Sequence, residues 1–91
     1  MNLGNAIKLL RTRQGLKQPQ LAEKAGISAS YLSLLERGKR DPSFSTVEQI
    51  ASALGVPVSI LVFLAASDNE LAGMSPELRE KLSYMALRLI P

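Results

Sequence analysis

The chain has 91 residues and a formal net charge of +3, and 46% of its residues are hydrophobic, which suits one small domain with a modest core. It contains no cysteine and no histidine, so the sequence supplies neither a disulfide framework nor the common ligands of a metal site. We expect no cofactor, no metal, no small-molecule ligand and no enzyme, because no nucleophile with a base, carboxylate pair or glycine-rich phosphate loop stands out.

The beginning of the chain, MNLGNAIKLLRTRQG, intersperses charged and apolar residues, unlike a secretory signal with its unbroken apolar centre. The longest apolar run, residues 56–66, contains Pro57 and Ser59 and is shorter than the ~20 residues that span a bilayer. We therefore expect no membrane segment and a cytoplasmic location.

The first predicted helix covers residues 5–14. Ile7 and Leu10, and Ala6 with them, point toward a core at helical spacing. Gly15 follows, and glycine commonly ends a helix because it adopts a left-handed backbone without a steric penalty.

Residues 18–25 and 29–37 predict two short helices joined by a tight turn, which is the most informative feature of the chain. Gly26 lies where the first of them must end. Ser28 suits the N-cap of the second, because its hydroxyl can accept a hydrogen bond from an unpaired backbone N–H. The spacing is typical of a helix-turn-helix.

The helix over residues 29–37 has two different faces when its side chains are placed about 100 degrees apart. Leu32 and Leu35 point toward the rest of the domain. The opposite face is mostly small and polar, and it consists of Ala29 at the leading edge, Ser30, Ser33, Leu34 and Arg37. One side is therefore buried and the other is exposed.

Two more helices close the predicted bundle. Ser43 or Ser45 can cap the fourth, and Ser45 with Glu48 forms a possible capping box. The inner stripe of this helix is apolar and consists of Val47, Ile50, Ala51 and Leu54. Pro57 starts the fifth helix.

A polar segment over residues 65–74 predicts a linker between a domain of residues 1–64 and a C-terminal part of residues 75–91. Ser75 and Pro76 form the start of a final helix that extends to Leu89. This helix carries an apolar stripe of Leu78, Leu82, Met85 and Leu89. The stripe must dock, either on its own domain or as a dimerisation surface on a second copy, and the two can coexist.

Three blocks of sequence, GLKQPQLAEKAGIS, LLERGKRDPS and IASALGVP, stand in an order and spacing that resembles the lambda-repressor-like helix-turn-helix proteins, also called the XRE family. The resemblance covers roughly residues 5–63. It implies an all-α fold, a five-helix DNA-binding bundle to which this chain adds a C-terminal helix. It also implies a transcriptional regulator that binds double-stranded DNA as a homodimer.

The resemblance implies roles for individual residues. The helix that starts after Ser28 would lie in the major groove and read base edges with Ala29, Ser30, Ser33, Leu34 and Arg37. This set offers little bidentate recognition, and Arg37 fits a base or a phosphate equally well. Gln18 matches a family position that grips a phosphate at a helix N-terminus. The further phosphate contacts are Lys17, Tyr31, Lys39, Arg40 and Ser43.

Glu36 is unsuited to DNA contact, because a carboxylate repels phosphate. It resembles the family glutamate that pairs with an arginine of the first helix, and Arg11 stands in the matching place. We expect a structural, partly buried ion pair between them.

The charge distribution favours DNA binding by the first domain. Eight basic residues face four acidic ones up to residue 64, a balance of +4, whereas three face four in the remainder, a balance of −1. The alternative function is a protein-binding module, such as an antitoxin or an adaptor, that uses the C-terminal helix to hold a partner. The sequence does not separate a phage repressor, a restriction-modification controller and an antitoxin.

Overall fold

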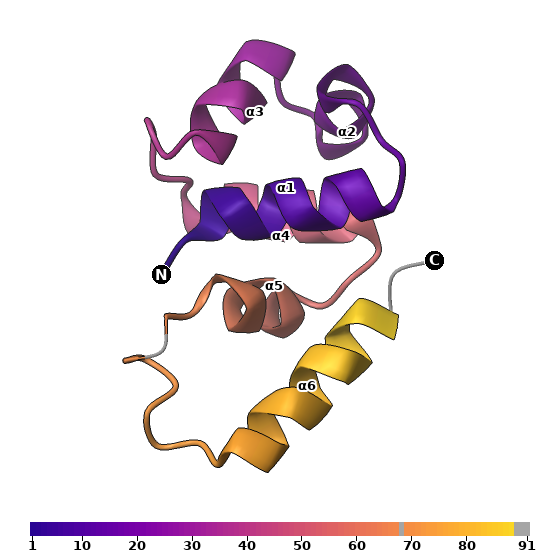
Figure 1. The fold of residues 1–91 in the computed structure, drawn as a ribbon. Coiled ribbons are helices and arrows are strands. Elements are labelled where there is room, and N and C mark those ends of the chain that lie inside the picture. Colours follow the sequence, from indigo (N-terminus) through magenta and orange to yellow (C-terminus); the bar gives the residue numbers. More distant parts are fainter. Residues whose placement is uncertain (68, 89–91) are drawn as a thin grey trace.

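The structure is a computed structural model that describes residues 1–67 and 69–88, and within that part every regular element is a helix. The six helices are α1 (Leu3–Arg13), α2 (Gln18–Ala25), α3 (Ala29–Glu36), α4 (Phe44–Leu54), α5 (Val58–Ala65) and α6 (Pro76–Arg88). The predicted fold class, an all-α bundle of five helices with one additional C-terminal helix, is confirmed (Figure 1).

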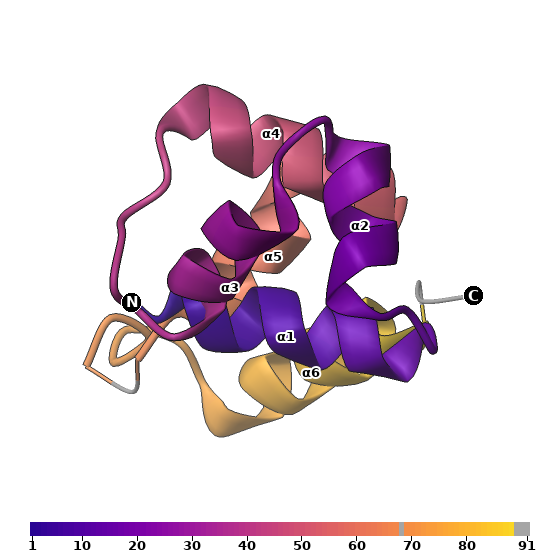
Figure 2. The same cartoon turned by 90° about the horizontal axis from the view of Figure 1, so that it is seen from above.

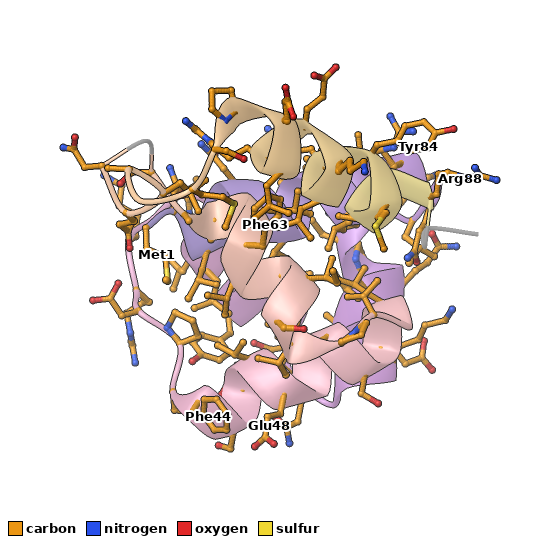
Figure 3. The ribbon with its side chains drawn as sticks, turned by 90° about the horizontal axis from the view of Figure 1, so that it is seen from below. Met1, Phe44, Glu48, Phe63, Tyr84 and Arg88 are labelled. Carbon is orange, nitrogen blue, oxygen red and sulfur yellow. The ribbon has the colours of Figure 1, made fainter. Side chains whose placement is uncertain are left out.

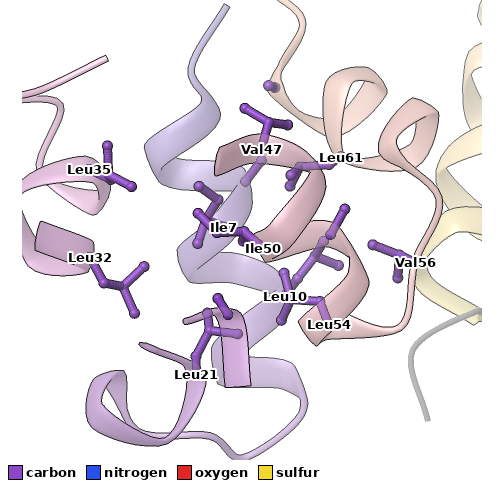
Figure 4. Packing of buried hydrophobic residues seen from close by; sticks show 14 of the residues in the cluster. Ile7, Leu10, Leu21, Leu32, Leu35, Val47, Ile50, Leu54, Val56 and Leu61 are labelled. Carbon is purple, nitrogen blue, oxygen red and sulfur yellow. The ribbon is translucent and has the colours of Figure 1, made fainter. Parts of the chain in front are cut away.

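Helix α1 crosses the middle of the bundle, with α2 and α3 on one side and α5 on the other (Figure 1). The apolar faces of α1 to α5 meet in one core, in which Ile7 and Leu10 of α1 are fully buried (Figure 4). Leu21, Leu32 and Ile50 reach the same cluster from α2, α3 and α4. The core therefore holds the pair α2 and α3 as a fixed unit against α1.

The start of α1 differs from the sequence prediction, whereas the start of α4 is the first of its two predicted alternatives. Helix α1 begins at Leu3, two residues early, because the Asn2 side chain caps it and accepts a hydrogen bond from the N–H of Asn5 at 3.0 Å. Ser43 caps α4 by accepting from the N–H of Thr46 at 3.2 Å. The capping box of Ser45 with Glu48 was wrong, because Ser45 already lies inside the first turn.

Helix α6 packs against α5 through a face that is rotated from its leucine stripe. Ala86 is buried, and Leu82, Ser83 and Leu87 are half-buried. Two members of the predicted stripe are left exposed, Leu78 at 46% and Met85 at 57%. Leu89, the fourth member, lies outside the described residues.

The start of the chain is tied to the segment that follows α5. The N–H of Asn2 donates to the carbonyl of Ala65 at 2.6 Å, and the ammonium of Met1 pairs with the carboxylate of Glu70 at 2.7 Å. The hydrogen bond from that ammonium, with further hydrogen bonds from Ser67, lowers the pKa of Glu70 to about 2. The carboxylate therefore stays charged until the pH falls through that range.

No described helix is by itself long and apolar enough to cross a membrane. Helices α4 and α5 reach that length and composition only together, and the chain bends by 105° between them.

Candidate nucleic-acid interface

The turn between α2 and α3 is built as the sequence predicts. Gly26 ends α2 in a left-handed conformation with φ of 73°, which glycine adopts without strain. The N–H of Ile27 then donates to the carbonyl of Ala22 at 3.0 Å. Ser28 caps α3 by accepting a hydrogen bond from the N–H of Tyr31 at 3.0 Å. These bonds fix the angle at which α3 leaves the corner.

Helix α3 is buried along one side and open along the other. Leu32 and Leu35 are fully or almost fully buried in the core. On the opposite side Ser30 is exposed, whereas Ser33 and Leu34 are half-buried. Ala29 is also half-buried and packs against the core, so it presents less surface than its place at the start of the helix suggested.

The N-terminus of α2 lies beside α3 and leaves a backbone donor open. Gln20 accepts a hydrogen bond from the N–H of Lys17 at 2.8 Å, and Pro19 has no N–H to satisfy. Within the part of the chain that the structure describes, the N–H of Gln18 has no hydrogen-bond partner. This donor sits at the positive end of the helix dipole, where anions bind favourably.

Beneath that N-terminus, Arg11 and Glu36 form a bidentate ion pair. Arg11 Nε donates to Glu36 Oε2 at 2.7 Å, and Arg11 Nη2 donates to Glu36 Oε1 at 2.9 Å. The side chain of Glu36 is only 2% exposed, so the pair is more deeply buried than predicted. A third Arg11 bond, from Nη1 to the carbonyl of Leu16 at 2.8 Å, holds the loop before α2.

Glu36 has a further partner that sequence reasoning missed. Gln18 Nε2 donates to Glu36 Oε1 at 3.0 Å, so the side chain predicted to grip a phosphate is already held by the carboxylate. No spacing rule reveals this contact, because it joins the start of α2 to the end of α3 across 18 residues.

The loop after α3 carries the exposed basic side chains. Gly38, with φ of 71°, turns the chain, and the N–H of Lys39 donates back to the carbonyl of Leu34 at 2.9 Å. Lys39 and Arg40 are both exposed. The Arg40 guanidinium lies 5.9 Å from the centre of the Tyr31 ring, a cation–π distance that holds this arginine near α3.

Two of the predicted contact residues have structural partners of their own. The hydroxyl of Ser43 caps α4 and also lies 2.9 Å from the hydroxyl of Thr46, so a phosphate contact there would compete with the cap. Arg37 follows the last residue of α3, is exposed, and donates from Nε to the carbonyl of Ser33 at 3.4 Å.

The predicted contact residues gather on one side of the molecule. Viewed from above, α2, α3 and the loop that leads to α4 lie nearest the viewer (Figure 2). Helix α6 lies on the far side of the bundle from α3 (Figure 1), so Leu78, Leu82 and Met85 belong to a different surface. In the described residues no cluster of acidic side chains could hold a metal ion.

Known proteins are similar to this chain over most of the helical bundle. A family model described as helix-turn-helix, HTH_3, matches residues 7–61. The immunity repressor protein of Bacillus phage phi105 is 50% identical over 62 residues, which are 68% of this chain and 43% of that repressor. The chain thus spans less than half of that relative's length.

Two solved structures superpose on this one. The restriction-modification controller protein C.AhdI from Aeromonas hydrophila gives a TM-score of 0.65 at 35% identity, over 66% of this chain and 91% of that one. The clp gene regulator ClgR from Corynebacterium glutamicum gives a TM-score of 0.71 at 31% identity, over 92% of this chain and 89% of that one. The second match is long enough to extend into α6.

Proposed function

The chain belongs to the helix-turn-helix family of DNA-binding transcriptional regulators of the XRE or lambda-repressor-like type, and from this premise we propose that it binds a specific inverted-repeat operator as a homodimer. Members of this family are regulators and not enzymes. The protein would act in the cytoplasm as a repressor or autoregulator, with one reading helix in each half-site.

The observation that carries the proposal is the open side of α3 with phosphate-binding groups on both flanks. On one flank lie the exposed Lys17 and the N–H of Gln18, which has no partner among the residues that the structure describes. On the other flank lie Lys39 and Arg40. A helix flanked by such groups can enter the major groove while both neighbouring backbones are held. The half-sites would then be centred about one helical turn, roughly 34 Å, apart.

Direct base reading would rest on a small set of side chains. Ser30 is exposed, and serine hydroxyls bond several bases. Ser33 and Leu34 lie further along the same side, where Leu34 can contact a thymine methyl. Because α3 offers no long amide side chain, much of the specificity would come from DNA shape and backbone fit.

Selection of bound sites from a random duplex pool, at one near-physiological salt concentration, tests the proposal. We expect an enriched inverted repeat with two half-sites about one helical turn apart. A pool that binds weakly and stays random would contradict sequence-specific binding and would direct attention to a protein partner for α6.

Lys39→Ala should weaken binding by about the same factor on the selected operator and on random duplex, because a phosphate contact carries no sequence information. The slope of log affinity against log salt should become smaller in magnitude by about 1. Fluorescence anisotropy titrations at four or five salt concentrations measure both quantities. Lys24→Ala removes the same charge from an exposed site on α2 and is the matched control, and equal effects of the two substitutions would contradict the assignment of Lys39.

The dimer would form through the apolar surface that α6 leaves open. Leu78 and Met85 are about half exposed, and neither is covered by the rest of the described chain. Figure 3 places Phe63 of α5 beside α6, and Phe63 is half-buried, so α5 can extend this surface. A second copy is the partner that a palindromic operator requires, since its two-fold symmetry mirrors that of the protein.

Leu78→Glu/Met85→Glu should convert the dimer to a monomer, because two charges would be placed in an apolar contact. Light scattering after size exclusion at micromolar concentration measures the mass. Gln49→Glu/Ser52→Glu adds the same two charges to exposed positions of α4 and should leave the dimer intact. A monomeric parent protein, or a double variant that stays dimeric, would rule out this surface.

A further inference from the structure

Glu36 makes one more hydrogen bond than an ion pair with Arg11 requires. Its Oε1 atom accepts from Arg11 Nη2 at 2.9 Å and also from Gln18 Nε2 at 3.0 Å. A bidentate arginine takes one lone pair on each oxygen of a carboxylate, so Oε1 keeps a second lone pair for another donor. The Gln18 amide is the donor that fills it.

Gln18 is a long, half-buried side chain with several rotatable bonds, and such a side chain loses rotamer freedom when it is fixed on a ligand. Its amide nitrogen has two hydrogens. One of them is used by Glu36, and no other hydrogen bond of this amide occurs in the described chain. The second hydrogen and the backbone N–H of the same residue are both left for an external acceptor.

The charge of Glu36 would repel a phosphate if it stood alone. It is neutralised here by Arg11, which bonds both of its oxygens, and the side chain of Glu36 is 2% exposed. A phosphate at the N-terminus of α2 would thus meet the amide of Gln18 and the helix dipole before it met the buried carboxylate.

From these contacts we propose that Glu36 is a positioning residue for DNA binding. Held by Arg11, it fixes the Gln18 amide in the orientation that binds a phosphate, before DNA arrives. Because Glu36 is the last residue of α3, the same bond sets the distance between the phosphate clamp and the reading helix. The inference rests on the proposed function, since it assigns a role within DNA binding.

The first test uses duplexes of the selected operator in which one phosphate at a time is replaced by an uncharged methylphosphonate. For the parent protein we expect a loss of roughly tenfold at one phosphate of each half-site, the one bound at α2. Gln18→Ala should bind the unmodified operator about five- to tenfold more weakly and should show a smaller penalty at that phosphate, because only the backbone N–H of residue 18 is left to bind it. The loss of affinity caused by replacing a phosphate on the Lys39 side should be the same for Gln18→Ala as for the parent protein.

The decisive variant is Arg11→Met/Glu36→Met, which replaces the buried pair by apolar side chains of similar size, an exchange that buried pairs often tolerate. When folded, it should show the same reduced penalty at the α2 phosphate as Gln18→Ala, and adding Gln18→Ala should weaken binding no further. The proposal would be overturned by a folded variant that keeps the parent's loss of affinity when the α2 phosphate is replaced. It would also be overturned if adding Gln18→Ala weakened binding by as much as it does in the parent protein. A purely structural ion pair would leave the effect of each methylphosphonate unchanged.

A second measurement needs no variant. In the free protein, the side-chain amide of Gln18 should have an NMR order parameter near that of rigid backbone, about 0.85, whereas a value below about 0.6 would show that it is not fixed in advance. If the parent protein selects no DNA, the proposed function fails and this inference fails with it. If it selects an operator while the Gln18 amide is mobile, only the positioning role of Glu36 is rejected.

Discussion

Glu36→Ala should lower the free energy of unfolding by about 3–5 kcal/mol, because it strands the buried Arg11 guanidinium without its carboxylate. The side chains of the pair are 11% and 2% exposed, so water cannot replace the missing partner. The loss is a large share of the roughly 5–15 kcal/mol that stabilises a domain. Urea denaturation followed by circular dichroism measures it.

The double variant Arg11→Ala/Glu36→Ala should lose little more than Glu36→Ala alone, because the second substitution removes the charge that the first left unpaired. Glu23→Ala removes a carboxylate from an exposed position of α2 and should change stability by less than about 0.5 kcal/mol. Additive losses in this double-mutant cycle would show that the two side chains do not act as a pair.

Gly4→Ala should also destabilise the fold, by about 1–3 kcal/mol, although alanine is the better helix former. A Cβ at Gly4 would lie 2.9 Å from the carbonyl oxygen of Glu36 and closer still to that of Leu35. These are backbone atoms at the end of α3, and the Leu35 carbonyl is held by the N–H of Gly38 at 3.1 Å. Neither can rotate away as a side chain would.

The same substitution should weaken operator binding beyond the loss of stability, because α1 and the end of α3 can separate only by moving the reading helix. Affinity is measured at a temperature where the variant is fully folded. Gly73→Ala is the matched control, since a Cβ there meets nothing within 4 Å. A Gly4→Ala protein as stable as the parent would show that α1 and α3 adjust more freely than their contact suggests.

The sequence predicts local structure well where a residue type has one common structural role. Gly26 and Ser28 predict the turn between α2 and α3, and both act there as expected. Pro76 likewise marks the first residue of α6. The boundaries of α2 were predicted to the residue, because a proline near its start and a left-handed glycine at its end leave little freedom.

Contacts between distant parts of the chain were harder to predict. The bond from Gln18 to Glu36 and the close approach of Gly4 to α3 depend on how three helices cross, which no spacing encodes. Gln14 is a further example, since its amide donates to the carbonyl of Leu54 at 2.6 Å and joins the ends of α1 and α4. Only the ion pair of Arg11 with Glu36 could be anticipated, and that came from family resemblance.

Helix α6 illustrates a different error of pattern reading. A stripe of large apolar residues suggested the docked side, yet Ala86 is the buried residue of α6, whereas Leu78 and Met85 of that stripe are exposed. Closely packed helices favour a small side chain at their contact, whereas the hydrophobic pattern of a sequence is dominated by its large side chains. The surface left open by this rotation is the one proposed for the second copy.

The placement of α3 and α6 on opposite sides of the core has an evolutionary consequence. The two surfaces share no side chain, so the effects of mutations in them should add independently. If the proposed dimer forms, one copy could, after gene duplication, acquire a new operator through α3 and keep its pairing partner, or change its partner through α6 and keep its operator. Two copies that diverge first at α6 would stop forming mixed dimers and become separate regulatory circuits while they still recognise the same DNA.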